Sequence, residues 1–215
     1  MKLQLRSDFR DFYDHMFDRS GDVFERFTRT DMHRRDVFEL LSRAGYKVPP
    51  HGTAAKIKSV FHAPDDGWTV VAYDDPFAHR GEGKRKTGVN TLDPETYCSL
   101  YLGTLSEITA TNVSYREVWI GRLWIGMCYR SNDEWRSNVG DVEIVTTGMS
   151  EDIPRPDAFV NFPLVAVDLV GSMDDGYAVD LNTAPGLSAV RDMLRAGEVV
   201  DHIKEFLETR HEPRL

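Results

Sequence analysis

Residues 164–187 read LVAVDLVGSMDDGYAVDLNTAPGL, and this stretch decides the fold. Two runs rich in alternating apolar residues flank a turn-forming SMDDG segment, the pattern typical of a β-hairpin. A turn in the middle of that segment places Asp168 opposite Asp180 and Ala166 opposite Asn182. Because side chains alternate along a strand, we expect the two aspartates and the asparagine on one face.

This acidic face predicts a magnesium site. Two carboxylates directly opposed across a strand pair destabilise a sheet unless a cation lies between them. Magnesium prefers oxygen ligands and commonly links carboxylates to substrate phosphates. Asp168, Asp180 and Asn182 are the predicted ligands, and the small Ala166 and Ala178 are expected to leave space on the same face. The residues alone leave a second interpretation open, a solvated acidic hairpin edge.

Composition limits the classes of protein. The chain has 215 residues, 41% hydrophobic and 28% charged, with a net charge of −9. These values are typical of a globular protein and make general nucleic-acid binding unfavourable. The first residues carry charges throughout, and no apolar run reaches transmembrane length, so we expect neither a signal peptide nor a membrane segment. The sequence predicts a cytoplasmic protein.

Cysteine and histidine offer no competing metal site. Cys98 and Cys128 are the two cysteines, far apart and without the spacing of a zinc site or a disulfide framework. The seven histidines likewise lack metal-type spacing. Magnesium bound by carboxylates therefore remains the best-supported metal.

Apolar periodicity predicts the remaining elements. Residues 7–29 are amphipathic, and a helix is expected after Asp31, ending at Gly45. Further helices are predicted over 93–107 and 187–211, strands over 68–73 and 141–147, and a hairpin over 116–129 that turns near Gly121.

The segment 74–88, DDPFAHRGEGKRKTG, is predicted to be a long polar loop and a candidate phosphate lid. Glycines let a backbone approach phosphate closely, and cations neutralise its charge. An ordinary solvated charged loop is the alternative. The candidate phosphate contacts in this segment are His79, Arg80, Gly81, Gly83, Lys84 and Lys86.

Three segments together resemble the ATP-grasp superfamily, especially the branch of ribosomal-protein glutamate ligases. RRDVFELLSRAGYKVPPHG (34–52) is similar to the opening helix and the glycine–proline segment of that branch. RSNDEWRSNV (130–139) is similar to its arginine–serine–asparagine segment, and 165–187 is similar to its metal-binding hairpin. The tail VDHIKEFLETRH (200–211) resembles its closing helix.

The resemblance implies an α+β, ATP-grasp fold in which two lobes clasp ATP. We expect a helical amino-terminal extension at 1–30 and a compact domain at 31–215, with a smaller lobe over about 53–110 and a larger lobe over about 111–215. The separate amino-terminal domain of many relatives is expected to be reduced or missing.

The resemblance also implies roles for individual residues. Asp168, Asp180 and Asn182 would hold Mg²⁺, with Mn²⁺ as a substitute. Arg136 and Asn138 would approach the phosphates or an acyl-phosphate, and Arg116 would position substrate or phosphate. Arg34 would contact phosphate, although a helix-surface arginine with solvent contacts alone is the alternative. The loop residues His79, Arg80, Gly81, Gly83, Lys84 and Lys86 would cover the phosphates.

The implied reaction is the phosphorylation of a carboxylate by ATP, followed by attack of an amine on the acyl-phosphate. The sequence departs from the family pattern in two places. Asp180 stands where the family has glutamate, and Tyr73 or Asp74 stands where it has a strand lysine, which leaves Lys84, Lys86 or Arg34 to replace that lysine.

The short chain further suggests that a second subunit, as a homo-oligomer, or a peptide or protein partner completes the acceptor site. Two other functions stay open, a catalytically silent nucleotide-binding or interaction protein of the same fold and a different magnesium-dependent phosphotransferase.

Overall fold

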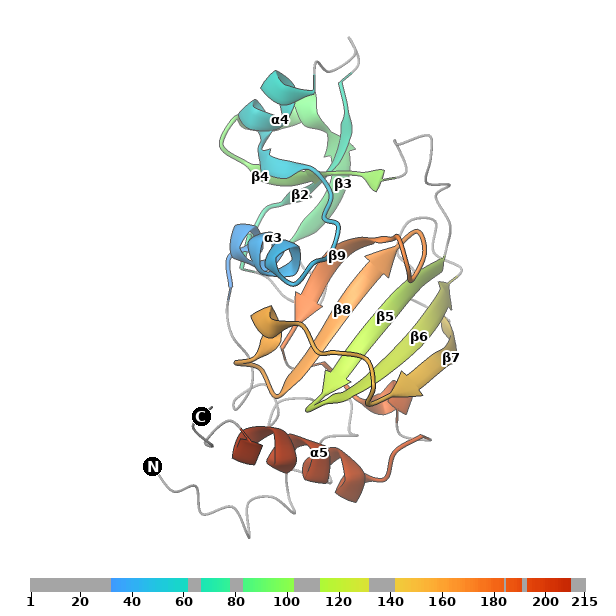
Figure 1. Cartoon of the computed structure of the whole chain (residues 1–215). Coiled ribbons are helices and arrows are strands. Elements are labelled where there is room, and N and C mark those ends of the chain that lie inside the picture. The colour runs from blue at the N-terminus through green and yellow to red at the C-terminus, as the bar shows by residue number, and fades with distance from the viewer. Residues whose placement is uncertain are drawn as a thin grey trace.

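Two antiparallel sheets with a few helices make an α+β structure (Figure 1). The computed structural model describes residues 32–61, 67–77, 83–102, 113–131, 142–183, 185–190 and 193–209. The predicted extension at 1–30 lies outside these residues.

The first sheet has the strand order β1-β4-β2-β3. One face of it is covered by the short helix α4, which buries Ala54 and Ile57 against Val70, Cys98 and Leu100. The elements of this part are β1 (His51–Thr53), α4 (Ala54–Val60), β2 (Thr69–Tyr73), β3 (Lys84–Gly88), the 3-10 helix η1 (Val89–Thr91) and β4 (Tyr97–Leu100).

The second sheet has the order β7-β6-β5-β8-β9. Its elements are β5 (Val113–Ile120), β6 (Leu123–Ser131), β7 (Val142–Ser150), β8 (Leu164–Val170) and β9 (Tyr177–Asn182). Two helices flank it, α3 (Arg34–Arg43) and α5 (Ala196–Thr209), with short 3-10 helices η3 (Asp157–Phe159) and η4 (Ser188–Val190).

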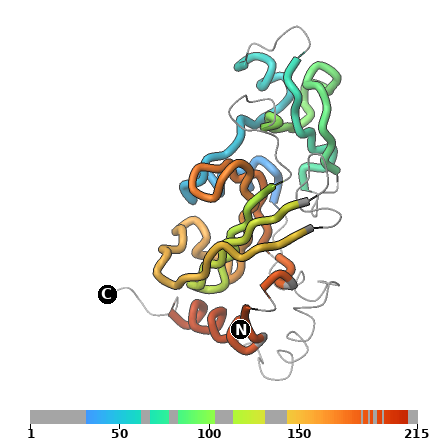
Figure 2. The backbone as a smooth tube through the Cα atoms, turned by 90° about the vertical axis from the view of Figure 1, so that its right-hand side faces the viewer, coloured from blue at the N-terminus to red at the C-terminus, as the bar shows by residue number. Residues whose placement is uncertain are grey.

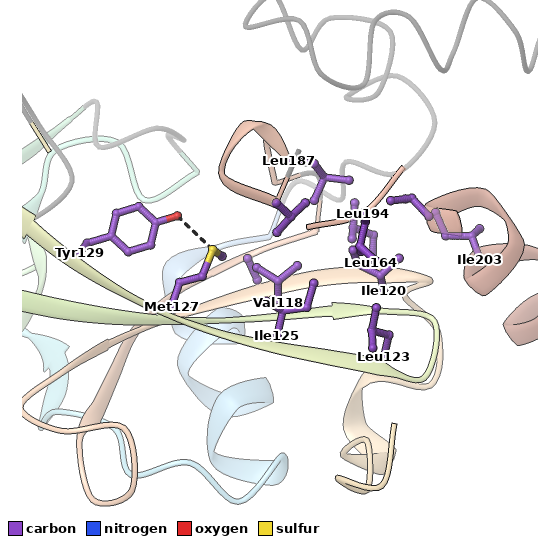
Figure 3. Close-up of a cluster of buried hydrophobic side chains, with 13 residues drawn as sticks. Val118, Ile120, Leu123, Ile125, Met127, Tyr129, Leu164, Leu187, Leu194 and Ile203 are labelled. Atoms are coloured by element: carbon purple, nitrogen blue, oxygen red, sulfur yellow. Dashed lines mark hydrogen bonds between the residues drawn. The ribbon is translucent and has the colours of Figure 1, made fainter. Parts of the chain in front are cut away.

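Helices bury both faces of the second sheet. On one face Val37, Phe38 and Leu41 of α3 share a buried cluster with Val165 and other alternate residues of β8. On the opposite face Val118, Ile125 and Leu164 of the sheet pack with Leu194 and with Ile203 of α5 (Figure 3). In the side view of Figure 2, the first sheet lies at one end of the molecule and α5 at the other, with α3 and the β8–β9 hairpin between them.

The predicted hairpin is confirmed in its register. Asp168 pairs with Asp180 and Ala166 with Asn182. A β-bulge follows, because the next pair is Leu169 with Ala178 and β9 therefore holds one extra residue. The prediction that Ala178 leaves space on the acidic face is wrong: the bulge shifts the alternation, and Ala178 is buried in the cluster below α3.

Two predicted segments have a different structure. The expected helix over 93–107 is wrong at Tyr97–Leu100, which forms β4 and pairs with both β1 and β2. The expected polar loop over 74–88 contains β3, whose Lys84–Gly88 backbone pairs with β2. In both cases hydrogen bonds to neighbouring strands of the sheet overcome a weak local preference.

The helix predicted after Asp31 and the terminal helix are confirmed with shifted ends. The first one begins at Arg34, and the Nδ1 of His33 accepts a hydrogen bond from the Arg35 backbone N–H at 3.0 Å as the cap. The terminal helix begins only at Ala196. No helix in the described part of the chain is long and apolar enough to cross a membrane.

Candidate functional site

Arg116 and Asp168 form a bidentate ion pair across β5 and β8. They are cross-strand partners. Nε of Arg116 donates to Oδ1 of Asp168 at 2.6 Å, and Nη2 donates to Oδ2 at 3.0 Å. The guanidinium lies 5.1 Å from the ring centroid of Tyr129. Such a two-point pair holds the carboxylate in one orientation.

Asp180, in the edge strand β9, has two cationic partners. Nη1 of Arg34 donates to its Oδ1, and Nζ of Lys84 donates to its Oδ2 at 2.6 Å. The backbone N–H of Leu181 also donates to Oδ1 at 3.0 Å. These partners come from α3 and from β3 of the first sheet, so the carboxylate joins both parts of the fold.

The placement of Arg34 follows from the start of α3. It is the first helical residue, and its backbone N–H donates to the Pro76 carbonyl at 2.8 Å. Its side chain is buried, with the guanidinium carbon 5.0 Å from the ring centroid of Tyr73. The alternative that Arg34 makes only solvent contacts is therefore wrong.

Lys84 reaches Asp180 from the first residue of β3. Its cross-strand partner is Tyr73, one of the two residues, with Asp74, that the sequence offered for the family's lysine position. Paired residues leave a sheet on the same face and at the same point along the strands. Lys86, two residues further on, lies elsewhere, with its Nζ 4.4 Å from the ring centroid of Tyr101.

The ion pairs control the charge states. Burial by itself would raise the pKa of Asp180, but Lys84 and Arg34 outweigh it and hold that pKa well below its usual range. Burial by itself would lower the pKa of Arg116, yet the pair with Asp168 raises it. Asp180 and Arg116 are therefore charged at neutral pH.

The three cations and two carboxylates leave the group with one net positive charge. The repulsion that predicted a metal between Asp168 and Asp180 is thus relieved by the protein's own side chains. Carboxylate oxygens are still the ligand type that magnesium takes, and each oxygen offers two acceptor positions. These oxygens fit magnesium if an anion binds with it, because the anion then balances the positive charge of the metal and of the three side chains.

The remaining predicted residues divide into two groups. Asn182 is exposed at the edge of the sheet, two residues from Asp180 and opposite Ala166, so it shares the acidic face. Gly83 has a φ of +63° just before β3, and its carbonyl accepts a hydrogen bond from the Asp74 N–H at 2.8 Å. The predicted residues outside the described part of the chain are His79, Arg80, Gly81, Arg136 and Asn138.

Sequence reasoning missed Tyr129 beside Arg116. The signal was present in the hairpin pattern, because Met127 is the cross-strand partner of Arg116 and residues two apart share a face. The conclusion needs the register of β6, which the turn at Gly121 supplies.

Comparison with solved structures identifies the fold. PsnB, an ATP-grasp ligase solved with a minimal precursor, aligns over 89% of this chain and 63% of its own, with 15% identity and a TM-score of 0.56. D-alanine–D-alanine ligase from Bacillus anthracis aligns over 84% of this chain and 68% of its own, with 13% identity and a TM-score of 0.54.

The chain has the ATP-grasp fold. A third ATP-grasp structure, a RiPP-associated ligase from Chryseobacterium gregarium with ADP and a leader and core peptide, aligns over the whole chain and 72% of its own, with 13% identity and a TM-score of 0.51. PsnB has also been solved with its precursor, Mg and ADP (TM-score 0.51, 16% identity, over 79% of this chain and 56% of its own). No protein-family model and no curated protein sequence matches the chain.

In the ATP-grasp fold of this chain, the ion pairs of Asp180 connect the β8–β9 hairpin to α3 and to β3 of the first sheet. Figure 1 shows the positions of these elements. The closer resemblance to ribosomal-protein glutamate ligases stays a prediction from the sequence.

Proposed function

We propose that the chain is an ATP- and magnesium-dependent carboxylate–amine ligase that forms an amide bond through an acyl-phosphate. One observation carries the proposal: Arg34, Lys84 and Arg116 converge from three elements on the two carboxylates of β8 and β9. A group of side chains with a net positive charge and two oxygen-rich acids suits a metal-bound triphosphate.

The chemistry of each side chain gives it a different proposed role. Lys84 and Arg34 would bind the phosphates, because lysine and arginine are the usual cationic phosphate ligands. Asp168 and Asp180, with Asn182 beside them, would hold Mg²⁺, which neutralises phosphate charge when bound. Arg116 fixes the orientation of Asp168 through both carboxylate oxygens. No covalent protein nucleophile is needed, since positioning and charge neutralisation supply the catalysis.

The comparison supports a proposal for the kind of acceptor. Two of the similar ATP-grasp ligases were solved with peptides, one with a minimal precursor and one with a leader and core peptide. We therefore propose a carboxylate on a peptide or protein as substrate, with a peptide partner or a second copy completing the acceptor site. PsnB was solved with Mg and ADP, which supports Mg²⁺ as the metal; Mn²⁺ is the proposed substitute.

The test separates binding from catalysis. ATP is titrated by calorimetry with and without Mg²⁺, and ADP release is then measured with peptide carboxylates and amines, added singly and together. Ligase chemistry requires magnesium-dependent binding and ADP release only with both substrates. ADP release with a stable phosphorylated product would instead identify a phosphotransferase, and binding without turnover would identify a silent nucleotide-binding protein.

A matched pair of variants localises the site. Asp180→Asn removes a proposed ligand, whereas Asp174→Asn changes an exposed carboxylate in the turn of the same hairpin. Magnesium-dependent nucleotide binding should fall in the first variant and stay unchanged in the second. An equal effect of the two substitutions would reject this position for the metal.

A further inference from the structure

Both carboxylate oxygens of Asp180 accept hydrogen bonds from side chains that belong to different parts of the fold. Lys84 occupies Oδ2 from the first sheet, while Arg34 and the Leu181 backbone N–H occupy Oδ1. We call the ion triad of Asp180, Lys84 and Arg34 the latch. Its members lie far apart in the sequence, so the folded arrangement alone creates it.

We propose that the latch keeps free divalent metal off Asp180 until nucleotide phosphates draw Lys84 away. The inference rests on the proposed nucleotide site and describes how that site is regulated. Asp180 gains affinity for the metal only when a nucleotide is bound. A divalent cation that approaches alone meets three positive charges and two carboxylates already paired with them. A triphosphate brings several negative charges and removes this barrier.

Lys84 is the member that moves. Arg34 is held by its backbone hydrogen bond to Pro76, and its side chain is only 5% exposed. The Lys84 side chain is 18% exposed, and it is a flexible stem with a point charge that can exchange one anionic partner for another. The pair of Arg116 with Asp168 uses two parallel hydrogen bonds and is harder to open.

The exchange couples two binding equilibria. If a nucleotide frees Asp180 for a metal, the metal must raise the affinity for the nucleotide by the same factor. Coupling between two sites commonly amounts to about 5- to 150-fold. The latch therefore predicts weak binding of metal alone to the wild-type protein and tight binding of metal in the presence of nucleotide.

The decisive experiment measures Mn²⁺ alone, without nucleotide, by electron paramagnetic resonance of free Mn²⁺. Lys84→Met should bind Mn²⁺ about tenfold or more tightly than the wild-type protein, because one blocking charge is gone. Lys84→Arg keeps the charge and should behave like wild type. Lys56→Met removes an exposed lysine of α4, which packs on the same sheet as Lys84, and it should leave binding of Mn²⁺ alone unchanged. Near-ultraviolet circular dichroism checks that each variant is folded.

The outcomes separate the latch from the proposed function. Equal Mn²⁺ binding by wild type and Lys84→Met overturns the latch, whatever the nucleotide does. Tighter Mn²⁺ binding in Lys84→Met, but not in the other two variants, supports the latch. A second titration adds ADP: wild type should gain Mn²⁺ affinity by the coupling factor, and Lys84→Met should gain less. Absence of any nucleotide binding would overturn the proposed function and the opening step, while the titration of Mn²⁺ alone would still decide whether Lys84 blocks the metal.

Discussion

Replacing Gly121 with alanine should destabilise the second sheet. Among the described glycines with a positive φ, we expect this one to be the position where an added methyl group costs most. Gly121 lies in the turn between β5 and β6 with a φ of +56°, and it is buried. A Cβ built there would lie 2.2 Å from the backbone oxygen of His202 and 2.8 Å from its carbonyl carbon, both in α5. Because these are backbone atoms, the helix itself must shift.

The magnitude has two parts. A left-handed backbone costs a residue with a Cβ about 1–2 kcal/mol. A shift of α5 loosens four buried side chains, and each buried apolar side chain contributes about 1.5–3 kcal/mol. Loss of roughly a quarter of that burial adds about 2 kcal/mol, for a total near 3–4 kcal/mol. The buried side chains of α5 are Val199, Val200, Ile203 and Phe206.

The assay is urea unfolding followed by far-ultraviolet circular dichroism, with a thermal melt in parallel. At about 2–4 °C per kcal/mol for a chain of this size, Gly121→Ala should lower Tm by roughly 6–16 °C. The control is Gly45→Ala, whose φ is +90° but whose Cβ would meet nothing within 4 Å. That variant should show the backbone cost of about 1–2 kcal/mol alone.

An equal loss of unfolding free energy in the two variants would refute the reasoning. It would mean that α5 yields without cost, and that the close approach of the turn to His202 does not hold the helix on the sheet.

Three further predictions concern charged side chains of the second sheet. The lowered pKa of Asp180 gives stability that is present above its unfolded pKa near 3.9 and is lost as pH falls toward the folded value. Urea midpoints of the wild-type protein should therefore decline below about pH 4, and Asp180→Asn should make that decline shallower. An equally steep decline in the variant would contradict this. Burial raises the pKa of Glu117, which accepts a hydrogen bond from Tyr46, so its contribution is present below the unfolded pKa near 4.3 and is lost as pH rises through the folded value. Glu117→Gln keeps an acceptor without the charge, and midpoints measured from pH 4 to pH 8 should fall less than in wild type; an identical pH profile would count against it. Arg116→Lys loses the bidentate pair and should cost about 1.5–3 kcal/mol of unfolding free energy, whereas an unchanged urea midpoint would show that one hydrogen bond suffices.

The hairpin at 164–187 shows how much could be predicted locally. Its turn residues and its alternation set the register, and the pairing of Asp168 with Asp180 is confirmed. The bulge after that pair was not predicted, because an extra residue in one strand leaves no mark on the hydrophobic pattern. Ala178 therefore lies on the opposite face from the one expected.

Local patterns failed where pairing with neighbouring strands of the sheet decides the structure of a segment. Tyr97–Leu100 has apolar residues that also fit a helix, but it is the strand between β1 and β2. Likewise Lys84–Gly88 is polar throughout and pairs as an edge strand with β2, where lysine and arginine side chains can reach solvent.

The sequence by itself determined the acidic face of the hairpin, the helix that begins near Arg34 and the turn at Gly121, because neighbouring residues specify each of them. Only the tertiary structure decided which charges meet there. Arg34 and Lys84 lie 146 and 96 positions from Asp180 in the chain. No local pattern relates residues so far apart, and an electrostatic argument from the hairpin alone showed only that a cation was required. The contacts of Arg34 in α3 and Lys84 in β3 with β9 supplied that cation from the protein itself.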